Sequence, residues 1–293
     1  MNREAEAIRK HVTSTQARGP AGYFINLDKS VGRRRAIEAE LAKVGLARRY
    51  RRFAAIDGDT LKMRNHAIEP GEAGCFLSHL GVMEAGAKTG GHFHVLEDDA
   101  ILSRDVAAHL AMITGDVIDN FDIVLTDMLL PFGPAFIHDL SAMYVAYRTG
   151  GTFNILAGHY WADLSSYVVN IKASGKLIRL LRDEVKAGMR LPVDLCIGNL
   201  VASGAVAVGC LFPFVTSIRQ SQILETTISR ARHSAAERMI VESPRAAFYI
   251  EADRMALRAG GDFRGACYRS QTQHRPALSG QIAGRHAGGA DRH

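Results

Sequence analysis

The sequence lacks paired cysteines and a leader-like start. Its four cysteines lie far apart in 293 residues and form no C-x-x-C pair, which argues against a disulfide framework and against a structural zinc site. Residues 1–20, MNREAEAIRKHVTSTQARGP, alternate charge with alanine and contain no apolar signal-peptide core. These absences predict a cytoplasmic protein whose thiols are reduced.

Charge is missing from one long stretch of the chain. Residues 195–218 contain no charged side chain, and the run is long enough on paper for a membrane helix. Gly204 and Pro213 interrupt it, and residues 205–211 are typical of a buried strand. We therefore expect no membrane-spanning helix in this run.

Positive charge is in modest excess, formally +6 at pH 7. From residue 268 onward four arginines oppose one aspartate, 4 − 1 = +3, so half of the excess lies in this tail. We expect the tail, 268–293, to be disordered and to offer a peripheral contact to an anionic membrane, at the inner membrane face. The basic run at 48–52 lacks further interleaved basic and aromatic residues, so we expect no nucleic-acid partner.

Strand and helix patterns alternate along the chain, which predicts an α/β fold. A short apolar strand at 23–27 precedes a helical pattern, and a helix from Gly71 precedes an apolar strand at 93–99. Such alternation is typical of a mostly parallel central sheet with ligands at the carboxyl ends of the strands. The later predicted elements are a helix at 104–113, a strand at 122–127, an irregular stretch at 128–163, a strand at 167–170, a helix at 173–186 and a strand at 205–211. The predicted domains are a catalytic domain at 20–220, a helical extension at 221–267 and the tail.

Three adjacent acids, Glu97, Asp98 and Asp99, follow the strand in VLEDDA. Mg²⁺ and Mn²⁺ bind carboxylate oxygens and water and leave positions for a diphosphate, so a strand end of this kind suits a divalent metal site. A basic side chain is a second candidate for the positive partner of the acids. The third alternative is a solvated turn in which Asp98 or Asp99 caps the next helix.

Four segments carry a resemblance to a known family. YFINLDKSVGRRR, FAAIDG, GEAGCFLSHL and VLEDDA, in this order and with these gaps, resemble the signatures of glycosyltransferase family 25, which includes lipooligosaccharide galactosyltransferases. The resemblance extends less densely through YVVNIKASGKLIRLL and LPVDLCIGNL, to about residue 220. It implies a GT-A-like fold, a UDP-sugar donor, usually UDP-galactose, a divalent metal, and an inverting transfer to a saccharide or lipid-linked saccharide acceptor.

The resemblance also implies site residues. Its acidic motif falls on Glu97, Asp98 and Asp99, as ligands of Mn²⁺ or Mg²⁺. One departure from the family pattern is Gly32, where a glutamate is common. The donor-binding candidates, from this motif match and from polar residues on the following helix, are Asn26, Asp28, Arg33, Arg34, Glu72, Ser78 and His79.

Glu72, Cys75 and His79 share one face of the predicted helix and suggest part of a zinc site. Zinc usually takes four ligands, and no other ligand is near in sequence. We therefore favour a histidine at position 79 that orients a carboxylate, with Glu72 and Ser78 making polar contacts in the site.

An inverting displacement needs a carboxylate base on the acceptor side. Asp194 is the first choice, because it lies in LPVD and matches the family's Pro-Val-Asp motif, and Asp127, at a strand end, is the second. The alternative role of Asp194 is the N-cap of a helix at 195–203. Trp161, beside Tyr160, suits stacking on a sugar or filling a core, and the sequence favours neither.

The combined prediction is a hexosyltransferase that uses a UDP-sugar, with galactose expected, and acts on a lipooligosaccharide or another cell-surface glycan. Two alternatives stay open at this point. One is a Mg²⁺-dependent phosphohydrolase, because acids at a strand end serve that chemistry too. The other is a non-catalytic nucleotide-sugar or polyanion-binding protein, which the basic tail permits.

Overall fold

The protein is described by a computed structural model, all of whose described residues belong to a structural unit that ends at Ala252. The described stretches are 20–61, 67–130, 133–157, 163–219 and 243–252. Tyr160, Trp161 and the predicted tail at 268–293 lie outside them, so what the sequence predicts for those residues stays a prediction.

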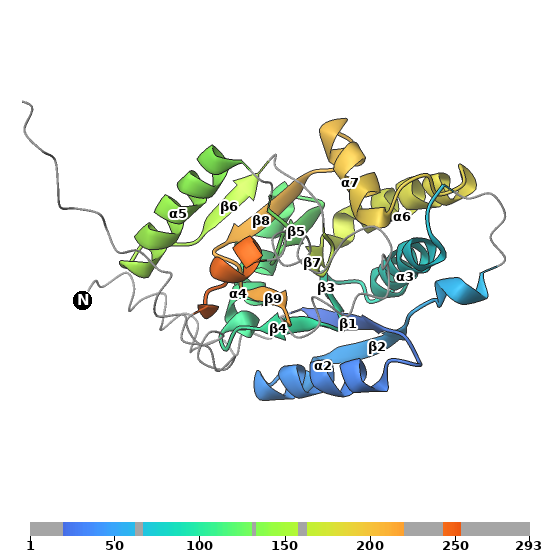
Figure 1. The fold of residues 1–293 in the computed structure, drawn as a ribbon, viewed down its shortest axis with the longest axis horizontal. Helices are drawn as coiled ribbons and strands as arrows, with labels where there is room; N and C mark the ends of the chain where they lie inside the picture. The colour runs from blue at the N-terminus through green and yellow to red at the C-terminus, as the bar shows by residue number, and fades with distance from the viewer. Residues whose placement is uncertain (1–19, 62–66, 131–132, 158–162, 220–242, 253–293) are drawn as a thin grey trace, which may run out of the picture. The chain divides into compact units, whose positions relative to one another are not determined.

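A seven-stranded sheet forms the centre of the unit, in the order β2-β1-β3-β7-β5-β8-β6 (Figure 1). Strands β2, β1, β3, β5 and β8 run in one direction, whereas β7 and β6 run in the other. The predicted α/β fold with a mostly parallel central sheet is confirmed, and it is consistent with a GT-A-like fold. The strands are β1 (Ala21–Asn26), β2 (Tyr50–Ala54), β3 (Phe93–Glu97), β5 (Ile123–Leu125), β6 (Asn154–Ala157), β7 (Ser166–Val169) and β8 (Val208–Phe212). A separate antiparallel pair consists of β4 (Ala100–Leu102) and β9 (Thr216–Ile218).

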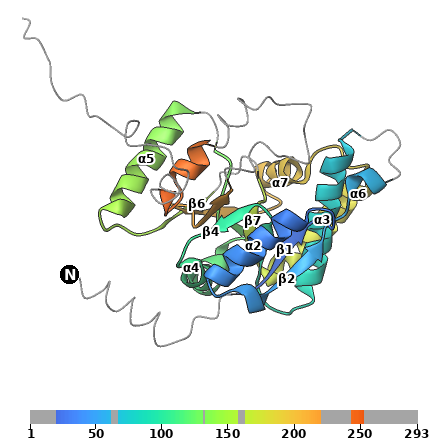
Figure 2. The ribbon, with the colours of Figure 1, turned by 60° about the horizontal axis from the view of Figure 1, so that its bottom comes forward.

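Helices cover both faces of the sheet and create two hydrophobic cores. Helices α3, α6 and α7 pack against one face, and α2 and α4 pack against the other (Figure 1). Figure 2 shows α2 in front of β1 and β2. The helices are α2 (Val31–Lys43), α3 (Pro70–Ala87), α4 (Val106–Met112), α5 (Pro134–Arg148), α6 (Ile171–Lys186) and α7 (Val193–Ala202), and shorter helical turns lie at Ala47–Arg49, Gly58–Thr60, Ile113–Val117 and Ile118–Asn120.

Side chains along the strands alternate between the two cores, because successive residues of a strand point to opposite faces. In β1, Tyr23 and Ile25 belong to the core under α3, whereas Phe24 belongs to the core under α2. In β3, Val95 and Leu96 divide in the same way. Both faces are therefore apolar, which explains why the sequence of these strands is a nearly continuous apolar run.

Close backbone contact fixes the beginning of α3. A Cβ atom on Gly74 would lie 2.5 Å from the carbonyl oxygen of Ile56, and one on Gly58 would lie 1.7 Å from that of Pro70. Both separations are far below van der Waals contact, so only glycine fits at either position. The face of α3 that carries Gly74 and Ser78 is thereby held against the turn that follows β2.

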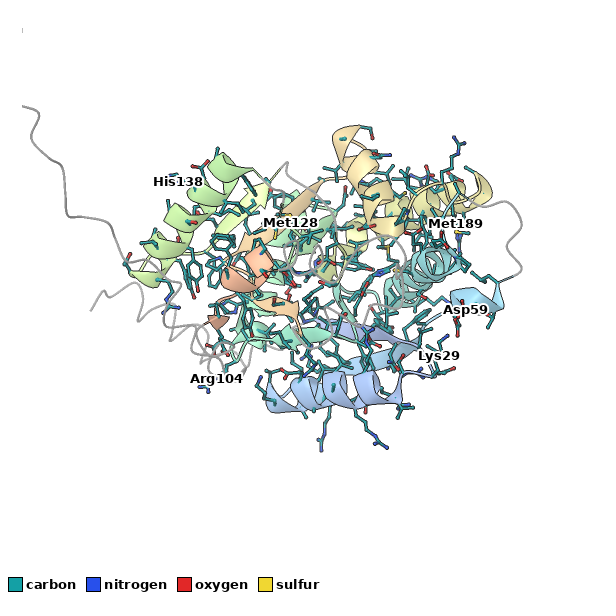
Figure 3. All side chains as sticks on the ribbon, in the orientation of Figure 1. Lys29, Asp59, Arg104, Met128, His138 and Met189 are labelled. Carbon is teal, nitrogen blue, oxygen red and sulfur yellow. The ribbon has the colours of Figure 1, made fainter. Side chains whose placement is uncertain are left out.

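An ion-pair cluster joins this turn to the loop after β1. Lys29 lies 2.5 Å from Asp57 and 3.4 Å from Asp59, which is labelled with Lys29 in Figure 3. Because both loops follow strands that run in the same direction, they meet at the carboxyl edge of the sheet.

The prediction of an irregular stretch at 128–163 is wrong, because its described part contains α5 and β6. Leu140 is buried in the core, and Phe136, Ile137 and Met143 pack against the same core at helical spacing. Pro134 occupies the first turn of α5, where a missing N–H carries no cost.

The uncharged run at 195–218 divides among α7, β8 and β9. Strand β8 begins at Val208, later than the predicted start of the strand at 205. Within the described ranges, no helix is both long and apolar enough to cross a membrane.

Residues 243–252 pack onto the same unit, although the predicted catalytic domain ends at 220. Phe248 and Tyr249 are buried, and Tyr249 forms a β-bridge with Phe214 next to β8. The Phe248 ring also meets those of Tyr144 and Phe212. Part of the predicted extension at 221–267 thus completes the core of the unit.

Candidate functional site

The carboxyl ends of β1 and β3 lie side by side and bring polar residues together. Ile25 opposes Glu97 in the parallel register, so Asn26 and Asp98 follow at the same edge. The Asn26 amide donates to Asp98 Oδ2 at 2.6 Å, and Asn26 Oδ1 accepts from Arg52 Nε at 3.0 Å. Asn26 therefore holds Asp98 in place.

Arg33, in the first turn of α2, is a basic partner of two of the acids. Its Nε lies 2.7 Å from Asp98 Oδ1, and its Nη2 lies 2.7 Å from Asp99 Oδ2. A cation at the start of a helix is disfavoured by the helix dipole, and the two carboxylates offset this. Arg33 is thus the basic side chain that the sequence offered as one of the candidate partners of VLEDDA.

The charge of Arg33 does not fully balance the acids. Asp99 Oδ1 is buried and has no hydrogen-bond partner. Burial, and then the charge of Glu97, raise the pKa of Asp99 to about 7, against the opposing effect of Arg33. Burial also raises the pKa of Asp98. A further cation beside these carboxylates would favour their ionised forms.

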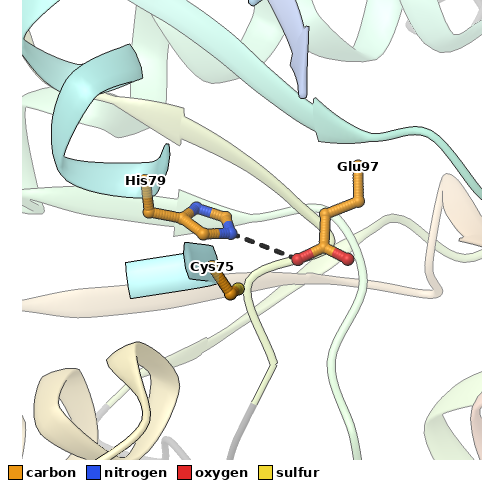
Figure 4. A group of neighbouring side chains, drawn as sticks. All are labelled: Cys75, His79 and Glu97. Carbon is orange, nitrogen blue, oxygen red and sulfur yellow. Dashed lines mark hydrogen bonds and ion pairs between the residues drawn. The ribbon is translucent and has the colours of Figure 1, made fainter. Parts of the chain in front are cut away.

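Glu97 is held by a histidine of α3. His79 Nε2 lies 3.1 Å from Glu97 Oε1, and this contact is the dashed line in Figure 4. His79 Nδ1 lies 2.9 Å from the hydroxyl of Tyr167 in β7. Burial opposes the ionisation of Glu97, but the hydrogen bond with His79 and the positive charges nearby outweigh it and lower the pKa of Glu97. This contact is the one expected of a histidine that orients a carboxylate.

The three adjacent acids do not converge on one point. Asp98 is turned toward Asn26 and Arg33. Among the described residues, the group of three or more ligand atoms within 4.8 Å of one another is formed by Cys75, His79 and Glu97. Glu72, which the sequence places on the same face of the helix, is not part of this group.

Asp127, the second candidate for the base, is sealed in a buried ion pair. Its Oδ1 accepts from Arg245 Nε at 3.1 Å and from the Met128 backbone N–H at 2.9 Å, and its Oδ2 pairs with Arg245 Nη2. Asp127 is 1% exposed and Arg245 2%. A carboxylate closed off in this way cannot reach a sugar hydroxyl, so the structure argues against Asp127 as the base.

Arg245 also binds Asp163 and so reaches the neighbourhood of Asp194. Asp163 has a φ of 91°, a region that few residues other than glycine adopt, and its carboxylate pairs with Arg245 and accepts from Ser165. The Asp163 backbone N–H donates to Asp194 Oδ2 at 3.4 Å. The buried guanidinium of Arg245 therefore anchors Asp163, whose backbone N–H donates one of the hydrogen bonds that Asp194 accepts.

Asp194 lies in the first turn of α7 and is partly buried. The helix begins at Val193 with Pro192 at its N-cap, so the alternative role of Asp194 as N-cap of a helix at 195–203 is wrong. Its Oδ1 accepts from the Leu195 backbone N–H at 2.9 Å. Both of its hydrogen bonds come from backbone N–H groups.

Two predicted donor-binding residues lie apart from the acids. Arg34 is exposed and pairs with Glu38 at 2.8 Å along the surface of α2. Asp28 is also exposed and pairs with Arg52. Arg52 in turn donates to Asn26, so Asp28 is linked to the acids only through this arginine.

Two further predicted residues hold the fold around α3. Glu72 is buried and accepts from the Glu69 backbone N–H at 2.9 Å, as half of a capping box. Ser78 is buried, donates to the Gly74 carbonyl at 2.6 Å and accepts from the Ile56 backbone N–H at 2.8 Å. These contacts are structural.

Sequence reasoning missed Arg245, Asp163 and Tyr167 as parts of the site. Arg245 lies in a weakly patterned segment, and Tyr167 looks like any apolar strand residue. The sequence signal for Asp163 was its position two residues after Trp161.

Comparison with known proteins identifies one family. The family model of glycosyltransferase family 25 (LPS biosynthesis protein) matches residues 20–197, more than half of the chain. The match includes Asn26, Arg33, the three acids and Asp194, and it ends before Arg245. No curated protein matches the chain.

Proposed function

Because the chain belongs to glycosyltransferase family 25, the LPS biosynthesis proteins, we propose that it transfers a hexose from a UDP-sugar to a saccharide hydroxyl. The family match shows a glycosyltransferase of LPS biosynthesis. The proposal adds galactose as the sugar, a free or lipid-linked oligosaccharide as the acceptor, inversion at the anomeric carbon, and dependence on a divalent cation.

The acid cluster at the end of β3 is the observation that carries this proposal. Asp99 Oδ1 is buried without a hydrogen-bond partner, and Glu97 uses one oxygen, Oε1, in its contact with His79. Hard cations bind such oxygens, and Mg²⁺ usually takes one or two carboxylates together with substrate phosphates and water. We assign Glu97 and Asp99 as ligands, whereas Asp98 positions Arg33. A bound Mn²⁺ or Mg²⁺ would neutralise the charge that develops on the departing diphosphate.

Arg33 adds a fixed positive charge at the same place. Asp98 and Asp99 hold its guanidinium from two sides at 2.7 Å each. An arginine fork suits phosphate oxygens, and its orientation here is already set before a donor binds. Arg34 points elsewhere, so we assign it no part in donor binding.

Asp194 is the base that we propose for the attacking hydroxyl. Burial, and then the charges of Glu97 and Asp194, raise the pKa of the Cys75 thiol, which supports a position of Asp194 near the acids of β3. The Asp194 carboxylate accepts hydrogen bonds from backbone N–H groups, in contrast to Asp127, which is paired with Arg245. As the acceptor oxygen attacks the anomeric carbon and the bond to the diphosphate breaks, the hydroxyl proton passes to the Asp194 carboxylate.

Product analysis tests the proposed reaction. The protein is incubated with UDP-galactose, Mn²⁺ and an LPS-core oligosaccharide, and the products are analysed by mass spectrometry and by NMR of the anomeric proton. We expect UDP release that requires the acceptor, together with a product of inverted configuration. Orthophosphate release would instead identify a phosphohydrolase, and ligand binding without turnover would identify a binding protein. The control variant is Asp183→Asn, which changes an exposed carboxylate paired with Lys186 on α6 and should release UDP as the wild type does.

A further inference from the structure

A thiol, an imidazole and a carboxylate meet where α3 faces the end of β3. Cys75 and His79 are four residues apart on α3 and therefore share one face of the helix. With Glu97 they offer three ligand atoms that lie within 4.8 Å of one another (Figure 4). This mixture of sulfur, nitrogen and oxygen differs from the all-oxygen set that Mn²⁺ or Mg²⁺ prefers.

The imidazole is oriented by a second partner, as in many metal sites. A ligating histidine almost always uses its other ring nitrogen in a hydrogen bond that fixes the ring. The Tyr167 hydroxyl lies 2.9 Å from His79 Nδ1, and the two rings stack at a centroid distance of 5.7 Å. A hydroxyl both donates and accepts, so Tyr167 supports either tautomer of His79. The tautomer with its proton on Nδ1 leaves the Nε2 lone pair for a cation.

The surroundings of the thiol favour a cation. Burial, and then the charges of Glu97, Asp194, Asp163 and Asp99, raise the pKa of Cys75. A bound metal ion reverses this situation, because it balances the acids and binds the thiolate directly. Cys75 and Glu97 are only partly buried, so an ion from solution can reach them.

We propose that Cys75, His79 and Glu97 form a binding site for a thiophilic divalent cation of the zinc class. Three protein ligands leave a fourth position for water, as in other open zinc sites. Zinc–ligand distances of 2.0–2.3 Å put tetrahedral ligand atoms about 3.3–3.8 Å apart, so movements of about 1 Å by the Cys75 or Glu97 side chain close the site. On binding, the thiol proton leaves to solvent, and the proton on His79 moves to Nδ1.

Occupation of this site has a consequence for the transferase. Glu97 would be withdrawn from the pair with Asp99 that we assign to Mn²⁺ or Mg²⁺, so Zn²⁺ inhibits turnover. This consequence rests on the proposed function. The binding itself does not, and it can be measured without donor or acceptor.

Co²⁺ alone is the probe for the site, because a cobalt–thiolate bond has an intense near-ultraviolet charge-transfer band that carboxylates and imidazoles do not produce. We expect the band to develop with one equivalent of Co²⁺ in the wild type and to disappear when Zn²⁺ displaces it. Cys75→Ala should lack the band, whereas Cys196→Ala, which changes a buried thiol of α7, should keep it. No band in the wild type, or a band that survives in Cys75→Ala, would overturn the proposal.

A second variant separates metal binding from a merely structural histidine. Tyr167→Phe removes only the hydroxyl that orients His79, and it should weaken Co²⁺ binding ~10–100-fold while the thiolate band keeps its shape. Unchanged Co²⁺ affinity in this variant would contradict the assigned role of His79. If Cys75→Ala does not fold, alkylation of the wild type followed by peptide mass spectrometry replaces it. Zn²⁺ should slow modification of Cys75, and an unchanged rate would overturn the site.

Discussion

Two carboxylate clusters lie at the carboxyl edge of the same sheet, and they differ in how completely a guanidinium neutralises them. The first cluster consists of Asp127, which follows β5, and Asp163, which precedes β7, and both pair with Arg245. Asp127 and Arg245 are almost fully buried. After β3, Asp98 and Asp99 share Arg33, one oxygen of Asp99 has no partner, and the Glu97 side chain is 26% exposed. The first cluster is closed and the second is open.

The difference separates a structural role from a binding role. A closed buried pair has satisfied charges, and removing one partner leaves an uncompensated charge in the interior. In the open cluster, burial, and for Asp99 also the charge of Glu97, raise the carboxyl pKa values of Asp98 and Asp99, and a cation beside them would favour their ionised forms. The same residue types thus anchor the fold after β5 and, in our proposal, bind the donor's cation after β3.

The largest effect should come from opening the closed cluster. Arg245→Met leaves Asp127 and Asp163 without their shared cation and should lower the free energy of unfolding by about 3–5 kcal/mol. For a unit of this size that corresponds to a melting temperature roughly 6–20 °C lower in a thermal unfolding experiment. The control is Arg182→Met, which removes an exposed pair with Glu84 and should cost at most about 1 kcal/mol. Equal small losses in both variants would show that the Arg245 cluster stabilises the fold no more than an exposed ion pair does.

The next effect concerns the proposed base beside the open cluster. Asp194→Asn keeps one acceptor oxygen for the Leu195 N–H at 2.9 Å, loses only the longer contact with the Asp163 N–H at 3.4 Å, and cannot take a proton. We expect kcat to fall by ~10²-fold or more, with UDP affinity and melting temperature close to those of the wild type. Steady-state kinetics and calorimetry on the same preparation measure both. Near-normal turnover would remove Asp194 from the mechanism.

A smaller effect should come from the arginine of the open cluster. Arg33→Ala leaves Asp98 and Asp99 unpaired and should lower stability in EDTA by about 1–2 kcal/mol, between the values for exposed and buried pairs. Saturating Mn²⁺ should restore much of that loss, and the donor KM should rise. Arg34→Ala is the matched control, because its exposed pair with Glu38 is worth little. A loss in Arg33→Ala that Mn²⁺ does not reduce would contradict an open cation site.

The smallest effect is the change of stability between pH 6 and 7 in the absence of metal. The folded-state pKa of Asp99 is raised to about 7, so the folded protein keeps a proton that the unfolded chain releases near its ordinary pKa of 3.8. Stability from this group is therefore complete below about pH 4 and is lost as the pH rises toward 7, with about 1 kcal/mol of that loss between pH 6 and 7. Denaturant unfolding in EDTA should show this fall in the wild type and not in Asp99→Asn. Parallel pH profiles would argue that Asp99 is not held in its neutral form.

The open cluster was largely predictable from sequence, because its acids are adjacent to one another and Asn26 and Arg33 lie in a recognisable local pattern. Strand ends and adjacent acids predict where carboxylates gather, and Arg33 lies in the first βα unit, directly after the neighbouring strand β1. Arg34 was assigned to the same role, but successive residues of a helix point about 100° apart, so only one of the two arginines faces the acids. Helix α5 was also predictable, since Phe136, Leu140 and Met143 recur at helical spacing after Pro134.

The closed cluster was not predictable in this way. Arg245 and Asp127 are 118 positions apart, and no local pattern marks either as the partner of the other. The same holds for His79 and Tyr167, which are 88 positions apart and meet only because α3 packs on the sheet. Pairings of this kind depend on tertiary packing, which periodicity and spacing do not encode.

Calorimetric titration of UDP tests the central claim most directly, that the open cluster after β3 binds the donor through a divalent cation. We expect UDP to bind the wild type in Mn²⁺ and to bind ~10-fold or more weakly in excess EDTA, because cation stabilisation of a diphosphate is worth several kcal/mol. Glu97→Gln and Asp99→Asn in Mn²⁺ should fall to the EDTA level, while Asp183→Asn should match the wild type. Equal UDP affinity in Mn²⁺ and in EDTA would contradict the account.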